Sequence, residues 1–193
     1  MKHPILWSLA LVALFAGPAM AKTRAEAERD INATYKVTQG SLSAEQRAKL
    51  QAAELAWIKF KDADVEFHRA WHGAAAAEAR YLDMTREREV YLALAHNFTA
   101  RLHQETETFT SDRPYAAADK ALNNAYGKLV TKLDATSRKK LLAAQLAWIA
   151  FRDAEAGFWK SWPREVMGKN SPHAVCMSTV TELRTMEFEK LNR

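Results

Sequence analysis

Two pairs of carboxylates, 91 positions apart, are the residues of this chain best placed for acid–base chemistry. Asp62 and Asp64 belong to the stretch KDAD, and Asp153 and Glu155 belong to the stretch RDAE. Asp64 and Glu155 stand inside a helical pattern of aromatic residues, and Asp62 and Asp153 fall within a second apolar face. A carboxylate buried in such surroundings has a raised pKa unless it gains a partner. Such acids could share general acid–base work.

Two arginines favour a structural interpretation of these acids. Arg88 and Arg184 lie at corresponding positions, each on the helix expected to follow a carboxylate pair, and a nearby opposite charge keeps a buried acid ionised. No His, Ser or Cys accompanies the acids at both places. We therefore predict no catalytic residues, but an ion-pair or capping network that fixes how the helices cross. Its members are Asp62, Asp64, Arg88, Asp153, Glu155 and Arg184.

One pair of histidines has a spacing that suits metal binding. His68 and His72 are four residues apart, so they share one face of a helix and could clasp a metal ion. No glutamate lies between them to serve as the base of a zinc protease, and the corresponding residues of the second half are Trp159 and Pro163. We predict no metal site and no cofactor. The sequence also lacks a glycine-rich phosphate loop, a nucleophile elbow and a cysteine cluster, so it does not favour an enzyme.

The chain has a single cysteine, Cys176, which excludes an internal disulfide bond. Cys176, Val180 and Leu183 follow helical spacing, and this favours a buried thiol. The alternative is an exposed thiol that links two chains as a homodimer.

The carboxylate pairs are part of an internal duplication. Residues 27–71 match residues 118–162 without a gap, and 19 of these 45 positions are identical. After a length change the match resumes, with Arg88 opposite Arg184, so the second copy is five residues longer in one loop. Two copies are too few for a solenoid, and a duplicated domain is the better interpretation.

Each copy is expected to be helical throughout, which predicts an all-α protein of two tandem three-helix units packed as a bundle. Helix starts are marked by capping residues, namely Thr23 with Glu26, Ser43 with Gln46, Asp134, and Ser171 followed by Pro172. The predicted helices cover 23–39, 43–72, 75–103, 117–131, 134–162 and 172–191.

The second helix of each copy carries a seam of apolar residues at spacings of three and four, which predicts a core-facing side. The expected core anchors are Trp57, Phe60, Trp71, Trp148, Phe151 and Trp162. Residues such as Leu55 and Leu146 fall on a different face, so this helix is apolar on two sides. We therefore expect it to be central in its unit, in contact with the helices before and after it.

The first residues resemble a secretory signal peptide. A charged start precedes an apolar run from Ile5 to Ala16, and the small-residue site Ala19-Met20-Ala21 follows. We predict cleavage after Ala21 and no membrane anchor afterwards, because the run is short for a bilayer span. The predicted segments are a signal peptide at 1–21, a first repeat at 22–104, a linker at 105–116 and a second repeat at 117–193.

The charge balance favours some partners over others. The net charge is +5, and it becomes +4 when the signal and its Lys2 are removed. In a secreted protein this mild excess favours protein partners or envelope polymers rather than nucleic acid.

Residues 118–155, "ADKALNNAYGKLVTKLD…LLAAQLAWIAFRDAE", resemble the lysozyme-inhibitor LprI-like family of small secreted helical proteins. The resemblance continues through residues 176–191 and recurs more weakly over 27–92, so it implies two tandem family domains. It also implies a periplasmic or secreted protein that binds a protein partner, and the family name suggests a lysozyme as that partner.

One departure from the family pattern concerns cysteines. The family usually has a Cys directly after the RDAE phrase, paired with the Cys that matches Cys176. Here that position is Ala156, and the two positions of the first copy are Val65 and Arg80. The resemblance therefore implies that both family disulfides are missing.

Two functional hypotheses follow. The first is a non-enzymatic inhibitor that occludes an animal-type lysozyme, and the second is a non-inhibitory envelope protein that binds another protein or a cell-wall fragment. Animal lysozymes are usually basic, so a cationic inhibitor needs a local acidic patch, for which Glu105 and Glu107 of the linker are candidates. Arg164 and Lys169, in the longer loop of the second copy, are candidates for contacting the acids of a cleft or anionic wall polymers.

Overall fold

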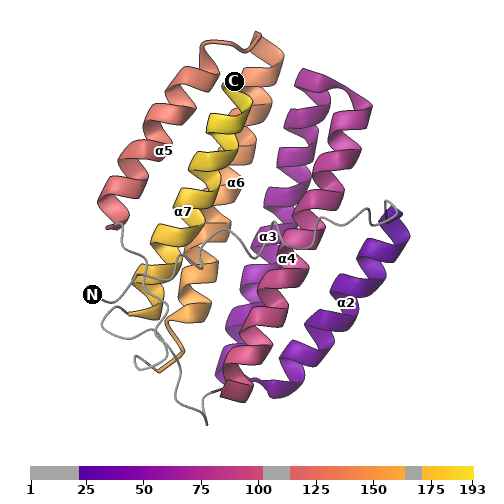
Figure 1. Cartoon of the computed structure of the whole chain (residues 1–193), viewed down its shortest axis with the longest axis vertical. Coiled ribbons are helices and arrows are strands. Elements are labelled where there is room, and N and C mark those ends of the chain that lie inside the picture. Colours follow the sequence, from indigo (N-terminus) through magenta and orange to yellow (C-terminus); the bar gives the residue numbers. More distant parts are fainter. Residues whose placement is uncertain (1–21, 102–113, 164–170) are drawn as a thin grey trace, which may run out of the picture.

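The structure, a computed structural model, describes residues 22–101, 114–163 and 171–193. These residues form helices and no strands, so the prediction of an all-α bundle is confirmed (Figure 1). The helices are α2 (Arg24–Ser41), α3 (Ala44–His72), α4 (Ala74–Arg101), α5 (Tyr115–Val130), α6 (Ala135–Trp159) and α7 (Pro172–Leu191). None of these helices combines the length and apolar character that a bilayer span requires. The predicted signal peptide and most of the predicted linker lie outside the described residues.

The helix starts are fixed by side chains that the sequence marks. The Thr23 and Ser43 hydroxyls accept hydrogen bonds from the backbone N–H groups three residues on, and Glu26 and Gln46 complete both capping boxes. The Asp134 carboxylate accepts a hydrogen bond of 2.8 Å from the Ser137 N–H. These caps satisfy N–H groups that a helix start leaves without partners, so the predicted starts lie within about two residues of the observed ones.

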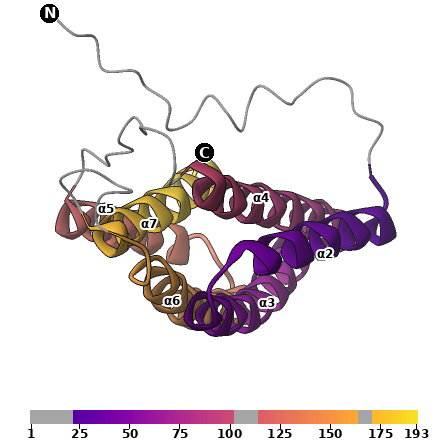
Figure 2. The same ribbon diagram turned by 90° about the horizontal axis from the view of Figure 1, so that it is seen from below.

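The long helices α3 and α6 pack against each other, antiparallel, at the centre of the molecule. Figure 2 shows α3 and α6 as one layer, α4 and α7 as a second layer, and α2 and α5 at the two edges. Phe60 and its repeat counterpart Phe151 stack with ring centroids 5.8 Å apart. Because equivalent residues meet there, the two repeats are related by an approximate two-fold axis that passes between α3 and α6.

The predicted seam forms the core. The aromatic anchors of both central helices are buried in one apolar cluster. They are Trp57 and Phe60 on α3, and Trp148 and Phe151 on α6. Trp162 is also buried, whereas Trp71 is half-buried and packs against the edge of the cluster. A single apolar core therefore spans both repeats.

The prediction that α3 and α6 are covered on two sides is wrong. Leu55 is 57% exposed and Leu146 is 60% exposed, because α2 packs mainly against α4 rather than α3, and α5 mainly against α7. The first helix of each repeat thus leaves the second apolar face of the central helix in contact with solvent.

Truncation of the core anchor Trp148 should strongly destabilise the protein. Trp148→Ala removes a ring that is 2% exposed, and such a truncation typically lowers the free energy of unfolding by about 3–5 kcal/mol. Val37→Ala, at an exposed position of α2, is the matched control and should change the free energy by less than about 1 kcal/mol. Urea unfolding followed by circular dichroism measures both. Equal midpoints for the two variants would show that Trp148 is not a core anchor.

Candidate functional site

The two buried carboxylates of the central helices pair with arginines of the opposite repeat. Asp64 on α3 is fully buried, and its Oδ1 lies 2.7 Å from Nη1 of Arg184 on α7. Glu155 on α6 is also buried, and its Oε2 lies 2.8 Å from Nη1 of Arg88 on α4. The predicted arginine partners are thus present, but each pairs with the buried central-helix acid of the other repeat rather than with that of its own repeat. Two symmetry-related ion pairs connect the halves of the molecule.

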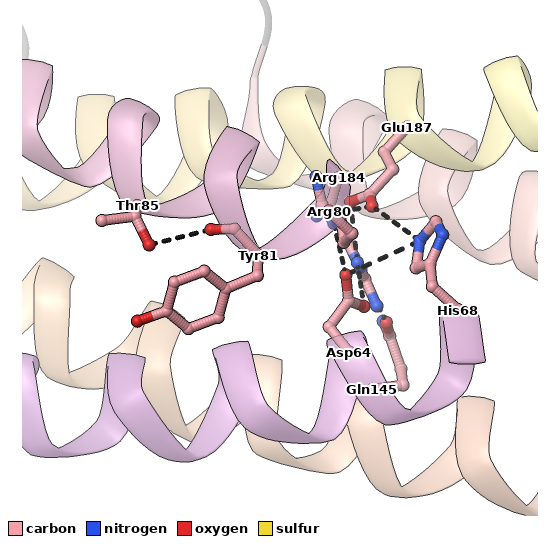
Figure 3. Close-up of polar contacts among 8 residues, drawn as sticks. All are labelled: Asp64, His68, Arg80, Tyr81, Thr85, Gln145, Arg184 and Glu187. Atoms are coloured by element: carbon pink, nitrogen blue, oxygen red, sulfur yellow. Dashed lines mark hydrogen bonds and ion pairs between the residues drawn. The ribbon is translucent and has the colours of Figure 1, made fainter. Parts of the chain in front are cut away.

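Around Asp64 these contacts extend into a polar cluster of Asp64, His68, Arg80, Arg184 and Glu187, the first cluster (Figure 3). Arg80 Nε donates to Asp64 Oδ2 at 2.7 Å, and Arg80 Nη2 lies 2.5 Å from Glu187 Oε1. Arg184 Nη1 also donates to Glu187 Oε2 at 2.7 Å. The two guanidinium groups therefore bridge the two carboxylates, and the cluster joins α3, α4 and α7.

The electrostatics of the first cluster keep Glu187 ionised. Burial alone would raise the pKa of Glu187, but the charges of Arg80 and Arg184 outweigh it and hold that pKa far below its usual range. Burial likewise acts to lower the pKa of Arg80, and Glu187 and Asp64 instead raise it. An acid held so firmly in its charged form is a weak base and has no proton to donate. The cluster therefore suits a structural role better than general acid–base catalysis.

His68 completes the first cluster. Its Nε2 lies 3.7 Å from Glu187 Oε1 and 3.9 Å from Asp64 Oδ2, and the three side chains offer ligand atoms within 4.8 Å of one another. Such donors suit a metal ion, but here Arg80 and Arg184 already neutralise both carboxylates. A cation would meet two positive charges at close range, which disfavours its binding. His72, the other half of the predicted clasp, is exposed.

The second cluster is the repeat-related counterpart of the first. It consists of Glu54, Arg88, Glu155 and Trp159. Arg88 Nε donates to Glu54 Oε1 at 2.6 Å, and Trp159 Nε1 donates to Glu155 Oε1 at 3.0 Å. Trp159 thus stands where the first cluster has His68. Burial raises the pKa of Glu54, against the opposing effect of Arg88.

Sequence reasoning missed several members of these clusters. Arg80, Glu187 and Glu54 have no counterpart of like charge in the other repeat, so the duplication gave no signal for them. Glu54 corresponds to Gln145, and Gln145 accepts a bond of 3.3 Å from Arg184 Nε. A polar residue at this position of both repeats was the available signal, because it lies on the same helix as each buried acid.

Two predicted network members lie elsewhere. The side chains of Asp62 and Asp153 are 65% and 57% exposed, and each binds a neighbouring cation, Lys61 or Arg152, at 2.8 and 2.7 Å. Their placement in a buried network is wrong. Each lies two residues, or 200° of helical rotation, from the buried acid that follows it, and therefore points to solvent.

Cys176 is buried, as the sequence favoured, and burial raises the pKa of its thiol well above the usual value. A disulfide between two chains needs an accessible thiolate, so this burial argues against a Cys176-linked homodimer. The four candidate partner-binding residues, Glu105, Glu107, Arg164 and Lys169, lie outside the described residues.

Known proteins resemble this chain in both halves. The model of the family described as "Lysozyme inhibitor LprI" matches residues 18–92 and 100–188. A crystal structure of an uncharacterized protein from Burkholderia thailandensis superposes with a TM-score of 0.64 at 21% sequence identity, covering 100% of this chain and 98% of that one. At this identity the likeness establishes the fold. No curated protein matches the chain.

Removal of a cross-repeat arginine should destabilise both repeats together. Arg184→Ala leaves Asp64 buried with one guanidinium fewer, and breaking a buried pair in this way typically costs about 3–5 kcal/mol of unfolding free energy. The control Arg69→Ala removes an exposed pair with Glu66 and should cost less than about 1 kcal/mol. Urea unfolding of the two variants compares the costs. A cost for Arg184→Ala no larger than that of the control would contradict the assigned role.

Glu187 should make the protein acid-sensitive. In the unfolded chain a glutamate titrates near pH ~4.3, whereas the folded protein holds the pKa of Glu187 lower, so acid protonates the unfolded chain first. The stability that this carboxylate contributes is complete above about pH 5 and declines as the pH falls through the lower pKa of the folded state. Glu187→Gln should therefore show a shallower loss of stability from about pH 5 to pH 3.

The measurement for Glu187→Gln is the urea midpoint across this pH range. The control is Glu189→Gln, which changes an exposed glutamate on the same helix. If the curves of wild type and Glu187→Gln ran parallel, the acid sensitivity would have another source.

Proposed function

Because this chain belongs to the LprI lysozyme inhibitor family, we propose that it is a secreted, non-enzymatic protein that binds an animal-type lysozyme and occludes its cleft. The observation that carries the proposal is the match of the family model to both repeats, over residues 18–92 and 100–188. Inhibition needs a surface that fits the enzyme and no reactive group of its own. The two repeats offer the partner two related copies of the same scaffold.

The interior of the described bundle supports a non-enzymatic role. Arginines hold its acids at 2.5–2.8 Å, namely the buried Asp64 and Glu155 and the part-buried Glu187. Ion pairs of this kind occupy the groups that a hydrolase would turn toward its substrate. Recognition of a partner then depends on the surface of the bundle and on its connecting segments.

The predicted signal peptide supports a periplasmic or secreted location, where an inhibitor would meet a lysozyme. The net charge of +4 after signal removal opposes long-range attraction to a basic enzyme. In this proposal Glu105 and Glu107 attract the enzyme, while Arg164 and Lys169 approach the acids of its cleft. The same positive charge supports a second candidate function, a non-inhibitory envelope protein that binds another protein or an anionic cell-wall fragment.

The inhibitor proposal predicts binding that depends on salt and on two separate charge pairs. Exposed charges are screened over roughly 8 Å at physiological ionic strength, so association should slow as salt rises. Reversing Glu105 and Glu107 to Lys should mainly lower the association rate, because peripheral charges steer encounter. Neutralising Arg164 and Lys169 to Gln should mainly raise the dissociation rate. Binding kinetics across salt concentrations, with an animal lysozyme as the probe, measure both rates.

A lysis assay with the same enzyme separates the two candidate functions. The control variant is Lys128→Gln, which changes an exposed residue of α5 and should leave inhibition unchanged. Unimpeded lysis at micromolar concentrations of the protein would refute inhibition. Binding to isolated cell-wall fragments would then support the second function.

A further inference from the structure

The outer side of the α3–α6 layer carries large apolar side chains in contact with solvent. Leu55 and Leu146 are 57% and 60% exposed, Ile58 and Ile149 are 43% and 36% exposed, and Leu142 is 51% exposed. We name these five residues the outer apolar face. In Figure 2, α3 and α6 form the lower edge of the bundle, and no other described helix lies beneath them.

The duplication has kept four of the five residues of this face. Leu55 corresponds to Leu146 and Ile58 to Ile149, although only 19 of the 45 aligned positions are identical, and Leu142 corresponds to Gln51. Core packing explains identity at buried positions such as Trp57 and Trp148, but the monomer gives no such reason at exposed ones. Exposed apolar groups gathered on one surface are typical of a site that another molecule covers.

We propose that a second copy of this chain covers the outer apolar face. The stacked rings of Phe60 and Phe151 mark the approximate two-fold axis, so the axis relates Leu55 and Ile58 of one half of the face to their counterparts in the other half. A partner that contacts both halves alike must itself have two equivalent halves. A second copy meets this condition with the same surface, as in the self-complementary interface of a two-fold dimer. An asymmetric partner would use the halves differently and would give no reason to keep both.

The area of the face suits a dimer. Helix α6, the shorter of the two, has 25 residues and is therefore about 38 Å long at 1.5 Å per residue. Two helices side by side, each about 10 Å across, present a strip of about 760 Å² that contains the outer apolar face. Mutual burial of two such strips gives about 1,500 Å², which lies within the range of stable interfaces.

Charge and shape also permit self-association. The exposed carboxylates next to the face, Asp62 and Asp153, each bind a neighbouring cation, so neither brings an unpaired negative charge to the interface. A groove of about 250 Å³ lies between α2 and α3, and Tyr35, Leu55 and Ile58 are among its lining residues. It gives an aliphatic side chain of the second copy a place to insert. The proposal does not depend on the proposed lysozyme inhibition.

The test is the molar mass of the chain from Lys22 on, measured by sedimentation equilibrium at about 1 to 200 μM. Interfaces of about this size associate at roughly micromolar concentrations or below. We expect the wild type to approach twice the monomer mass. The variant Leu55→Glu/Leu146→Glu places four carboxylates in the interface of a dimer and should weaken association at least about hundredfold. Both positions are exposed, so its helical circular dichroism and unfolding midpoint as a monomer should remain native.

The matched control is Val37→Glu/Met186→Glu, which changes two exposed apolar residues on α2 and α7 and should still dimerise. A wild type that stays monomeric at 200 μM would overturn the proposal. Equal weakening by both double variants, or by neither, would also overturn it. If the wild type is monomeric and Leu55→Glu/Leu146→Glu alone loses binding to lysozyme, the face belongs to that partner and not to a second copy.

Discussion

Burial of two arginines at the boundary between the repeats is the constraint on which this structure depends. Arg88 and Arg184 are 3% and 2% exposed, and a guanidinium cannot shed its charge, so each must find acceptors inside the protein. Arg88 obtains one carboxylate from α3 of its own repeat and one from α6 of the other. Arg184 likewise reaches across to Asp64. Neither repeat alone supplies all the partners of its arginine, which favours folding of the two as one unit.

The two clusters show how a duplication can diverge while it keeps its charges paired. Each cluster retains one cross-repeat arginine and two carboxylates, but the second carboxylate comes from α7 in the first cluster, as Glu187, and from α3 in the second, as Glu54. The first cluster adds Arg80 where the other repeat has Cys176. The extra guanidinium lies against both acids of its cluster, so the first cluster contains two ion-paired acids and two arginines.

Local features of the fold could be predicted from the sequence, and long-range ones could not. Caps such as Ser43 and Asp134 act within three residues, and the seam of Trp57 and Trp148 repeats with the helical period, so helices and core followed from the sequence directly. The ion pair between Arg88 of the first repeat and Glu155 of the second depends on the antiparallel contact of α3 and α6. No local sequence pattern specifies this contact. The prediction that Leu55 is buried was wrong for the same reason. Leu55 is exposed because α2 packs against α4, and this tertiary contact is not specified by a local pattern either.

The contrast between interior and surface bears on where such a protein recognises its partners. Inside, the acids that could have done chemistry are bound by arginines, and any gain from a ligand there would have to exceed the cost of breaking buried ion pairs. Outside, Leu55 and Leu146 keep their apolar character although the bundle does not use it. Transferring such side chains from water to an interface is favourable and requires no existing contact to break. Binding of a partner at the surface therefore requires less free energy than binding in the interior, and the duplication doubles the surface available for it.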